Sequence, residues 1–193
     1  FNAGQKGLKG GVDEGGVRVP FFVRWKNKIN SGKDVKKLAA HIDIFPTFAD
    51  LAGLKLNEKL SNQIEGRSLL KLIENPDATW QDRFLFTQRA RWKTGAEPND
   101  HMWQNFAVRN QRYRLVGERL FDMIKDPAQK NDISKENAGV VESMRKAYDD
   151  FWKSSRPLMV NETVPMSKVR PYHVWFKEQS MNKGIPTWDD PKL

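Results

Sequence analysis

The stretch that says most about the fold spans residues 9–20 and is Lys9-Gly10-Gly11-Val12-Asp13-Glu14-Gly15-Gly16-Val17-Arg18-Val19-Pro20. It is a glycine-rich loop that leads into an apolar run. Glycines let backbone N–H groups approach an anion closely, and a lysine among them adds a compact positive charge. We expect Glu14 and Arg18 to pair and fix the loop. Taken alone, the stretch fits a plain turn as well as an anion site.

The composition is that of a globular chain with an excess of positive charge. Its 193 residues are 38% hydrophobic, and the 7 Trp and 11 Phe can supply much of a core. The net charge is +9, and residues 1–40 hold nine basic against three acidic residues. This excess favours anionic partners, although a solvated basic surface gives the same balance. The absence of cysteine excludes disulfides, thiolate metal sites and cysteine nucleophiles within these residues.

No targeting or membrane segment is visible in the sequence. No stretch approaches the roughly 18 apolar residues that a membrane helix needs, so we expect no membrane span. Residues 1–4 lack the basic and apolar regions of a signal peptide. Because the chain starts without Met in a glycine-rich loop, we expect it to be part of a longer protein. The compartment of that protein is then not readable from this sequence.

Apolar patterning predicts three elements after the loop. Residues 21–25 are Phe-Phe-Val-Arg-Trp, which predicts a buried or half-buried strand. Apolar residues at helical spacing predict a helix within residues 35–52, and Gly53 stands where a helix C-terminal glycine belongs. A second short helix is predicted at residues 68–73, where Asn75-Pro76 stops it.

The pattern then changes to short apolar runs at residues 84–87, 106–109, 113–116 and 119–122. Because the later connections are short enough for hairpins, these runs predict an antiparallel meander. An amphipathic helix follows, and its apolar stripe is Val140, Val141, Met144, Ala147, Tyr148 and Phe151. We expect this helix to cover one face of the sheet. Beyond Arg156 the periodicity ends, and prolines with large aromatics indicate a segment that wraps over another surface.

The glycine-rich stretch and several later motifs resemble the sulfatase family. Lys9-Gly10 before Glu14-Gly15-Gly16-Val17-Arg18-Val19-Pro20 resembles the sulfatase pattern Lys-Gly, then Glu-Gly-Gly-x-Arg-x-Pro. Further similarities follow in chain order across residues 1–160, namely Phe1-Asn2-Ala3-Gly4, residues 41–47, Asp50-Leu51-Ala52-Gly53, residues 66–70, Ala107-Val108-Arg109, residues 113–116, Leu120-Phe121-Asp122, Asp126-Pro127 and Asn131. One departure is Asp13, where the family often has an aromatic residue. An acid there is unfavourable near a sulfate unless it points away.

The resemblance implies an α/β fold, the C-terminal portion of an alkaline-phosphatase-like α/β sandwich, followed by a small antiparallel sheet packed on a C-terminal helix. We expect residues 1–77 to be the end of the catalytic α/β domain with the sulfate-site loop. Residues 78–160 would form the sheet-and-helix subdomain, and residues 161–193 a proline-rich wrapping tail. The strand at 21–25 and the helix at 42–52 would pack against the missing N-terminal half. Apolar surface would then be exposed in the isolated chain.

The resemblance also implies that the full-length protein hydrolyses sulfate esters and that Lys9 contacts the sulfate group. The family's nucleophile is a formylglycine made from Cys or Ser, and its metal is usually calcium held by Asp and Asn residues. These residues are expected upstream of Phe1, so the isolated chain should be inactive and bind no metal. A periplasmic or extracellular location is implied by the family.

Substrate-binding residues are expected between the first two strands of the meander. In related sulfatases this region returns to the active-site cleft, so Arg89, Arg91, Trp92 and His101 are candidates here. An aromatic ring stacks on a sugar or aryl group, and guanidinium binds anionic groups. A plain core role for Trp92 remains an alternative. We expect His41 to be an interior, hydrogen-bonded residue and His173 to be structural.

Two other functions remain open at this point. One is a phosphoesterase or phosphonate hydrolase of the same superfamily, because the nucleophile that distinguishes them is missing. The other is a polyanion-binding module, which the positive charge and the aromatics would suit. The strands show no recognisable aromatic nucleic-acid signature, so we expect no nucleic-acid partner. The substrate itself, an aryl sulfate or a sulfated glycan, cannot be named from the residues.

Overall fold

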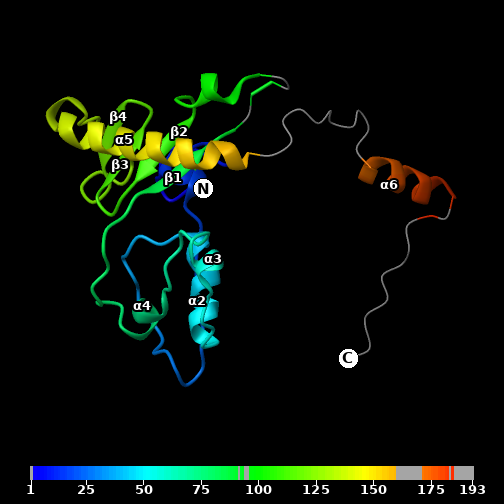
Figure 1. Cartoon of the computed structure of the whole chain (residues 1–193), viewed down its shortest axis with the longest axis horizontal. Helices are drawn as coiled ribbons and strands as arrows, with labels where there is room; N and C mark the ends of the chain where they lie inside the picture. Colours follow the sequence, from blue (N-terminus) through cyan, green and yellow to red (C-terminus); the bar gives the residue numbers. More distant parts are fainter. Residues whose placement is uncertain (1, 91, 94–95, 160–170, 183, 185–193) are drawn as a thin grey trace. The chain divides into compact units, whose positions relative to one another are not determined.

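A computed structural model describes residues 2–90, 92–93, 96–159, 171–182 and 184. The chain divides into two compact units, Phe1–Leu158 and Met159–Leu193. In the second unit the described helix is α6 (Pro171–Asn182), which Figure 1 labels. The sequence analysis predicted no helix there, so α6 is a correction. Its apolar residues do not gather on one side, and helical periodicity is therefore not visible in the sequence.

Four short strands form one antiparallel sheet in the first unit. They are β1 (Leu85–Gln88), β2 (Phe106–Arg109), β3 (Tyr113–Val116) and β4 (Arg119–Asp122), in the spatial order β1-β2-β3-β4. The predicted meander is confirmed, and β1 begins and ends one residue later than expected. At the turn between β3 and β4, Gly117 has a φ of 59°, the left-handed conformation that tight hairpins favour.

One face of the sheet is covered by the long helix α5 (Ala138–Ser155), as Figure 1 shows. The helix buries Met144, Tyr148 and Trp152, which recur every four residues. The Tyr148 ring stacks on Phe106 with centroids 4.4 Å apart. Its hydroxyl oxygen lies 2.9 Å from both Gln88 Oε1 and the Met102 carbonyl oxygen, and these two acceptors share its single proton. The predicted packing of helix on sheet is confirmed, and Trp152 extends the apolar stripe beyond its predicted end.

Three short 3₁₀ helices lie near α5. One is in the loop between β1 and β2, one directly precedes α5, and one directly follows it. They are η2 (Pro98–His101), η3 (Lys135–Asn137) and η4 (Arg156–Leu158). The indole N–H of Trp152 donates to Asn99 Oδ1 at 2.9 Å, which fixes η2 against the end of α5.

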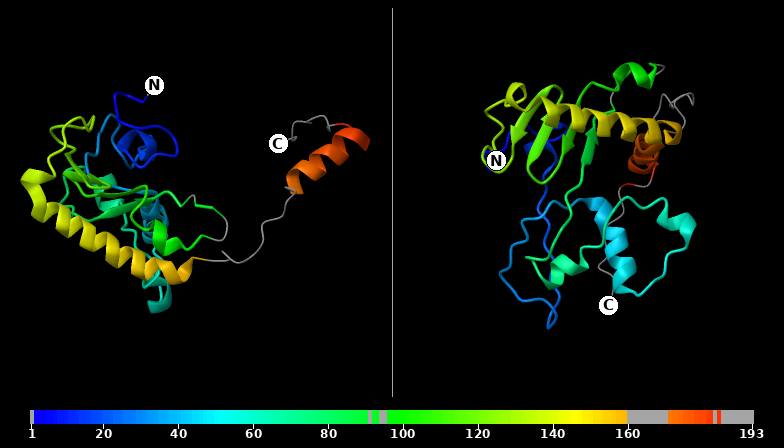
Figure 2. Two further views of the ribbon diagram at one scale, coloured as in Figure 1. Left: turned by 90° about the horizontal axis from the view of Figure 1, so that it is seen from above. Right: turned by 60° about the vertical axis from the view of Figure 1, so that its left-hand side comes forward.

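The opposite face of the sheet is covered by the N-terminal loop. A cluster of buried side chains joins Val12 of the loop to the strands and the turn after them, namely Ala107, Val116, Phe121 and Met123. Figure 2, in its left view, shows the strands lying between α5 and the blue loop that contains α1 (Glu14–Val17). Successive strand residues point to opposite faces, so each strand contributes side chains to the contact with α5 and to the contact with the N-terminal loop.

A set of short helices follows the loop, namely η1 (His41–Asp43), α2 (Ile44–Leu51), α3 (Glu58–Ser61) and α4 (Leu70–Glu74). The helix predicted within residues 35–52 is shorter than expected, because the backbone before His41 is extended. Gly53 has a φ of 64°, which confirms the predicted helix C-terminal glycine. The short helix predicted at residues 68–73 is confirmed as α4.

Asp43, at the start of α2, is fully buried and joins this region to the sheet. Its carboxylate accepts hydrogen bonds from the backbone N–H groups of Ala40 and Arg67, both at 2.8 Å. It also forms a bidentate ion pair with the guanidinium of Arg83, which precedes β1. Buried charges are tolerated when they are paired and hydrogen-bonded in this way.

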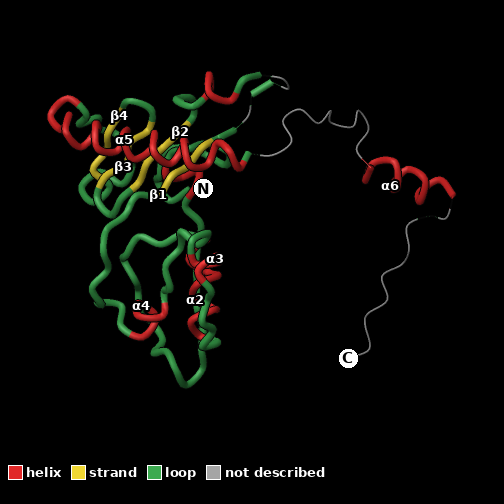
Figure 3. The backbone as a smooth tube through the Cα atoms, in the orientation of Figure 1, coloured by secondary structure: helices red, strands yellow, loops and turns green. Residues whose placement is uncertain are grey.

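The strand predicted at residues 21–25 is absent, and this is a second correction. Figure 3 shows the stretch between α1 and α2 as loop, and Phe22 is 90% exposed. A strand needs a neighbour to satisfy its backbone groups, and none of the four strands in the described residues pairs with this stretch. The predicted exposure of apolar surface is confirmed here and on α2, where Phe45 and Phe48 are exposed.

Candidate functional site

Lys9 lies at the tip of a tight turn. The N–H of Gly11 donates to the Leu8 carbonyl at 2.8 Å, which places Lys9 and Gly10 in the middle of the turn. Gly10 has a φ of 84°, as a type II turn requires at its third position. Lys9 is exposed, and in the described part of the chain no hydrogen bond or ion pair involves its ammonium group. The turn therefore presents this cation to solvent.

The later glycines of the loop serve close backbone packing. A Cβ on Gly16 would lie 2.5 Å from the Gly11 carbonyl oxygen, so only glycine fits there. The N–H of Gly15 donates to the Lys6 carbonyl at 2.7 Å, and the N–H of Gly16 donates to the Asp13 carbonyl at 2.9 Å. These N–H groups are thus used inside the loop and do not cradle an anion. The Lys9 side chain is left as the exposed cation of the turn.

Asp13, the departure from the family pattern, is held by a side chain from the loop that follows β4. Its Oδ1 accepts a hydrogen bond from Gln129 Nε2 at 3.2 Å. Gln129 is buried, and its Oε1 accepts the backbone N–H of Glu14 at 2.8 Å. One oxygen of the Asp13 carboxylate is therefore engaged with Gln129, and the Asp13 charge also favours the charged form of Arg114.

Glu14 is a buried carboxylate surrounded by three arginines. Its Oε1 lies 3.5 Å from Arg18 Nη1, which confirms the predicted pair. Its Oε2 lies 3.6 Å from Arg109 Nε and 3.4 Å from Arg114 Nη2. Burial lowers the pKa of Arg114 to about 10, although the Glu14 charge acts in the opposite direction. Burial lowers the pKa of Arg109 as well.

Sequence reasoning missed Arg109 and Arg114 as part of the site. They face each other in the β2–β3 register. A signal for them was present, because the predicted hairpin already places both arginines on one face. Two like charges opposite each other destabilise a strand pair, so an acid from elsewhere was required.

The candidate substrate-binding residues are only partly brought together. Trp92 is half-buried and stacks on His101, with ring centroids 5.5 Å apart and planes 8° from parallel. The Nδ1 of His101 lies 3.0 Å from Gln104 Oε1. Arg89 is exposed just after β1, and Arg91 lies outside the described residues. Among the described residues, no hydrogen bond, ion pair or ring contact joins Arg89, Trp92 or His101 to Lys9.

The two other histidines are exposed. His41 was expected in the interior, and this expectation is wrong because Asp43 is the residue that η1 buries. His173 lies on α6.

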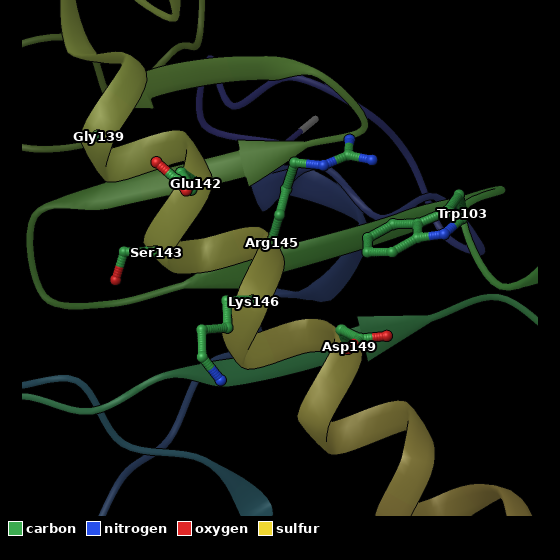
Figure 4. A pocket seen from close by; sticks show the side chains of 7 residues that line it. All are labelled: Trp103, Gly139, Glu142, Ser143, Arg145, Lys146 and Asp149. Atoms are coloured by element: carbon green, nitrogen blue, oxygen red, sulfur yellow. The ribbon is translucent and has the colours of Figure 1, made fainter.

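A separate groove runs along the outer side of α5, with a volume of about 620 Å³. Figure 4 shows its lining, which is Trp103, Gly139, Glu142, Ser143, Arg145, Lys146 and Asp149. The Arg145 guanidinium carbon lies 4.4 Å from the Trp103 ring centroid. The groove is shallow, mixes acids with bases, and includes none of the candidate residues. We therefore do not assign the functional site to it.

The described residues contain neither a group of metal-ligating side chains nor a membrane-spanning helix. Within residues 2–90, 92–93, 96–159, 171–182 and 184, no three His, Cys, Asp or Glu side chains are grouped to hold a metal ion. These residues therefore supply no ligand group for the calcium that the family resemblance implies. None of the helices in the described residues has the length and apolar character needed to cross a bilayer.

Comparison with known proteins identifies the class to which this fold and loop belong. Residues 9–154 match the family described as N-sulphoglucosamine sulphohydrolase, C-terminal. The match begins at Lys9 and ends in α5, so it spans the loop, the short helices and the whole sheet. The chain belongs to this family of sulfatase C-terminal regions, as the resemblance predicted.

Individual relatives agree with this assignment. The chain is 29% identical to human steryl-sulfatase over 157 residues, which cover 67% of this chain and 26% of that protein. It is 25% identical to an N-acetylglucosamine-6-O-sulfatase of Bacteroides thetaiotaomicron over 170 residues, which cover 75% of this chain and 29% of that protein. The chain thus spans about a quarter of the length of these relatives.

A solved structure shares the fold. The crystal structure of Ps i-CgsB superposes with a TM-score of 0.65 at 24% identity, covering 93% of this chain and 37% of that one. The predicted fold class is confirmed, an alkaline-phosphatase-like fold with a small antiparallel sheet and its covering helix.

Proposed function

We propose that the full-length gene product hydrolyses sulfate esters and that Lys9 binds the sulfate group. One observation carries the proposal. In a chain of a sulfatase family, the exposed lysine stands at the tip of a turn whose next residues are anchored in the core. An ammonium group held at this place would offset negative charge on the sulfate oxygens as it develops in the transition state.

In this proposal the catalytic parts are shared between this chain and the rest of the gene product. Other residues of that product supply the formylglycine nucleophile and the calcium ligands, and this chain contributes one rim of the site. The exposed apolar side chains of residues 21–25 and of α2 pack against those parts. The isolated chain then has no turnover and binds no calcium. A periplasmic or extracellular location belongs to the same proposal.

We assign the substrate to sulfate esters of ring compounds, either sulfated glycans or aryl sulfates. Trp92 and His101 form a stacked aromatic pair, and Arg89 and Arg91 are close to Trp92 in the sequence. An aromatic pair suits the face of a sugar or aryl ring, and arginines suit further anionic groups. The relatives support a ring compound, since one is named for a sterol and the other for an amino sugar.

The test is an activity assay on the full-length gene product. A chromogenic aryl sulfate, a panel of sulfated sugars, and matching phosphate and phosphonate esters are compared for wild type and Lys9→Ala. We expect turnover of a sulfate ester and a loss in kcat/KM of about 100-fold or more in Lys9→Ala, the effect of removing one transition-state donor. The matched control is Lys33→Ala, an exposed lysine remote from the turn in sequence, which should retain wild-type activity.

Three results would contradict the proposal. Wild-type kcat/KM in Lys9→Ala would remove Lys9 from the site. Cleavage of phosphate or phosphonate esters alone would favour the related phosphoesterase function. Binding of sulfated polymers without any cleavage would favour a polyanion-binding module.

A further inference from the structure

We propose that Glu14 is a positioning residue for Lys9. It holds the Lys9 turn against the sheet by bridging the cross-strand arginines Arg109 and Arg114, and so sets where the ammonium group meets the sulfate. This inference rests on the proposed role of Lys9. It adds a residue of this chain that acts on the substrate only through Lys9.

The sheet needs an acidic side chain next to Arg109 and Arg114, because two like charges stand opposite each other there. Arg109 and Arg114 are directly paired residues of β2 and β3. They share the face of Ala107 and Val116, which is the face opposite α5. Arg114 is only 2% exposed, so water does little to screen the two positive charges from each other. In the described residues Glu14 is the acid that forms ion pairs with both.

Among the described residues, Glu14 is the acid within ion-pair distance of both arginines, although the more distant charges of Asp13 and Asp82 also favour the charged forms of Arg114 and Arg109. The Nε and Nη1 atoms of Arg114 are buried and make no hydrogen bond to any described residue. Glu14 therefore supplies the neutralising charge for a buried cationic pair. Removing one partner of such a group leaves uncompensated buried charge, which is strongly unfavourable. The position of the Glu14 carboxylate is accordingly well determined by the sheet.

Glu14 is connected to Lys9 through a short loop that makes further contacts with the sheet. Beside Glu14, Val12 is buried in the apolar cluster on the same sheet face, and the N–H of Glu14 is held by Gln129. Between Val12 and Lys9 stand only Gly10 and Gly11, and the Gly11 N–H closes the turn. The loop cannot slide on the sheet while these contacts hold. A shift at Glu14 would therefore displace Lys9.

A double-mutant cycle on the full-length gene product tests this inference. Glu14→Gln keeps the size and the backbone N–H of residue 14 but removes the charge. We expect Glu14→Gln to lower kcat/KM for the sulfate ester by about 10- to 100-fold, the cost of a displacement near 1 Å, mainly through kcat. In the Lys9→Ala background the same change should lower kcat/KM less than about 2-fold, because coupled residues are not additive. Glu14→Asp, which keeps the charge, should recover part of the activity.

The matched control is Glu118→Gln. Glu118 is an exposed residue of the same sheet whose carboxylate lies 3.9 Å from Arg145. This variant should retain wild-type kcat/KM. Thermal melting of every variant separates a displaced loop from an unfolded protein. If Glu14→Gln does not fold, Arg18→Gln is taken through the same cycle, since the Arg18 side chain touches the same carboxylate and is 65% exposed.

The outcomes distinguish the two proposals. Wild-type activity in Lys9→Ala overturns the proposed function together with this inference. A large loss in Lys9→Ala, combined with an effect of Glu14→Gln that is equal in both backgrounds or absent, overturns this inference alone. For Arg18→Gln the expected loss is smaller, and an additive or absent effect again overturns it. A loss that disappears in the Lys9→Ala background supports it.

Discussion

Phenylalanines in two regions of the first unit have opposite fates. Phe106 in β2 is 1% exposed, whereas Phe22 in the stretch after α1 is 90% exposed. Phe106 has a strand on each side and the ring of Tyr148 above it. Phe22 belongs to a run that is just as apolar, but the described residues supply neither a neighbouring strand nor a second layer. Apolar sequence buries itself only where the chain also provides the opposing surface.

The largest expected effect is on the free energy of unfolding, when one phenylalanine from each region is replaced by alanine. Phe106→Ala should lower the free energy of unfolding of the 193-residue chain by about 3–5 kcal/mol, through lost burial and a cavity under α5. Phe22→Ala should change it by less than about 0.5 kcal/mol, because the side chain is already in water. Urea denaturation followed by circular dichroism measures both. Equal changes in the free energy of unfolding for the two variants would contradict the difference in burial between the two regions.

A smaller effect is expected at Asp43, which ties the α2 region to the sheet through Arg83. Asp43→Asn should cost about 3 kcal/mol at neutral pH, because the Arg83 guanidinium is left without its buried partner. The control is Asp150→Asn, whose exposed pair with Lys146 is screened by water and should contribute far less to stability. A cost at Asp43 no larger than at Asp150 would mean that the two regions are not held together by this ion pair.

The pH dependence of stability checks the same residue. Burial alone would raise the pKa of Asp43, but hydrogen bonds from Arg83, Arg67 and Ala40 outweigh it and hold the pKa below its ordinary value of 3.8. A lowered pKa in the folded state means that Asp43 stabilises the fold above pH 3.8. This contribution is lost as the pH falls through the folded-state value. The stability difference between wild type and Asp43→Asn should therefore shrink on acidification below that pH. A constant difference would contradict the assignment.

The parts of the fold that could be predicted depend on contacts between residues that are close together in the sequence. The strands β2 to β4 are joined by tight turns, so period-two patterning places them almost to the residue. The Glu14–Arg18 pair is four residues apart and follows from spacing alone. The failure at residues 21–25 has the opposite cause, since whether an apolar run becomes a strand depends on a partner that no local pattern contains. The helix α6 was missed because it has no apolar stripe.

In the candidate site, too, the residues in local motifs could be predicted, and those that depend on distant contacts could not. Lys9 was identified from a local motif, and its display on a turn follows from the glycines around it. The anchoring of that turn depends on Arg109, Arg114 and Gln129, which lie about a hundred residues further along the chain. The predicted hairpin places Arg109 and Arg114 on one face, but only the meeting of two distant segments on that face shows that Glu14 is their partner. The stacking of Trp92 on His101 is likewise a product of the loop path between β1 and β2, which the sequence does not determine.

Hydrogen–deuterium exchange on the 193-residue chain tests most directly whether the loop that carries the Lys9 turn is anchored to the sheet. The backbone N–H groups of Gly11, Gly15, Gly16 and Arg18 are hydrogen-bonded within the loop, and the loop is anchored by Val12 and Glu14. We predict that residues 11–18 exchange as slowly as β2 to β4, while residues 21–37 exchange fast. In Glu14→Gln the protection of residues 11–18 should fall, and that of α5 should remain. Exchange of residues 11–18 as fast as that of residues 21–37 in the wild-type chain would contradict the account.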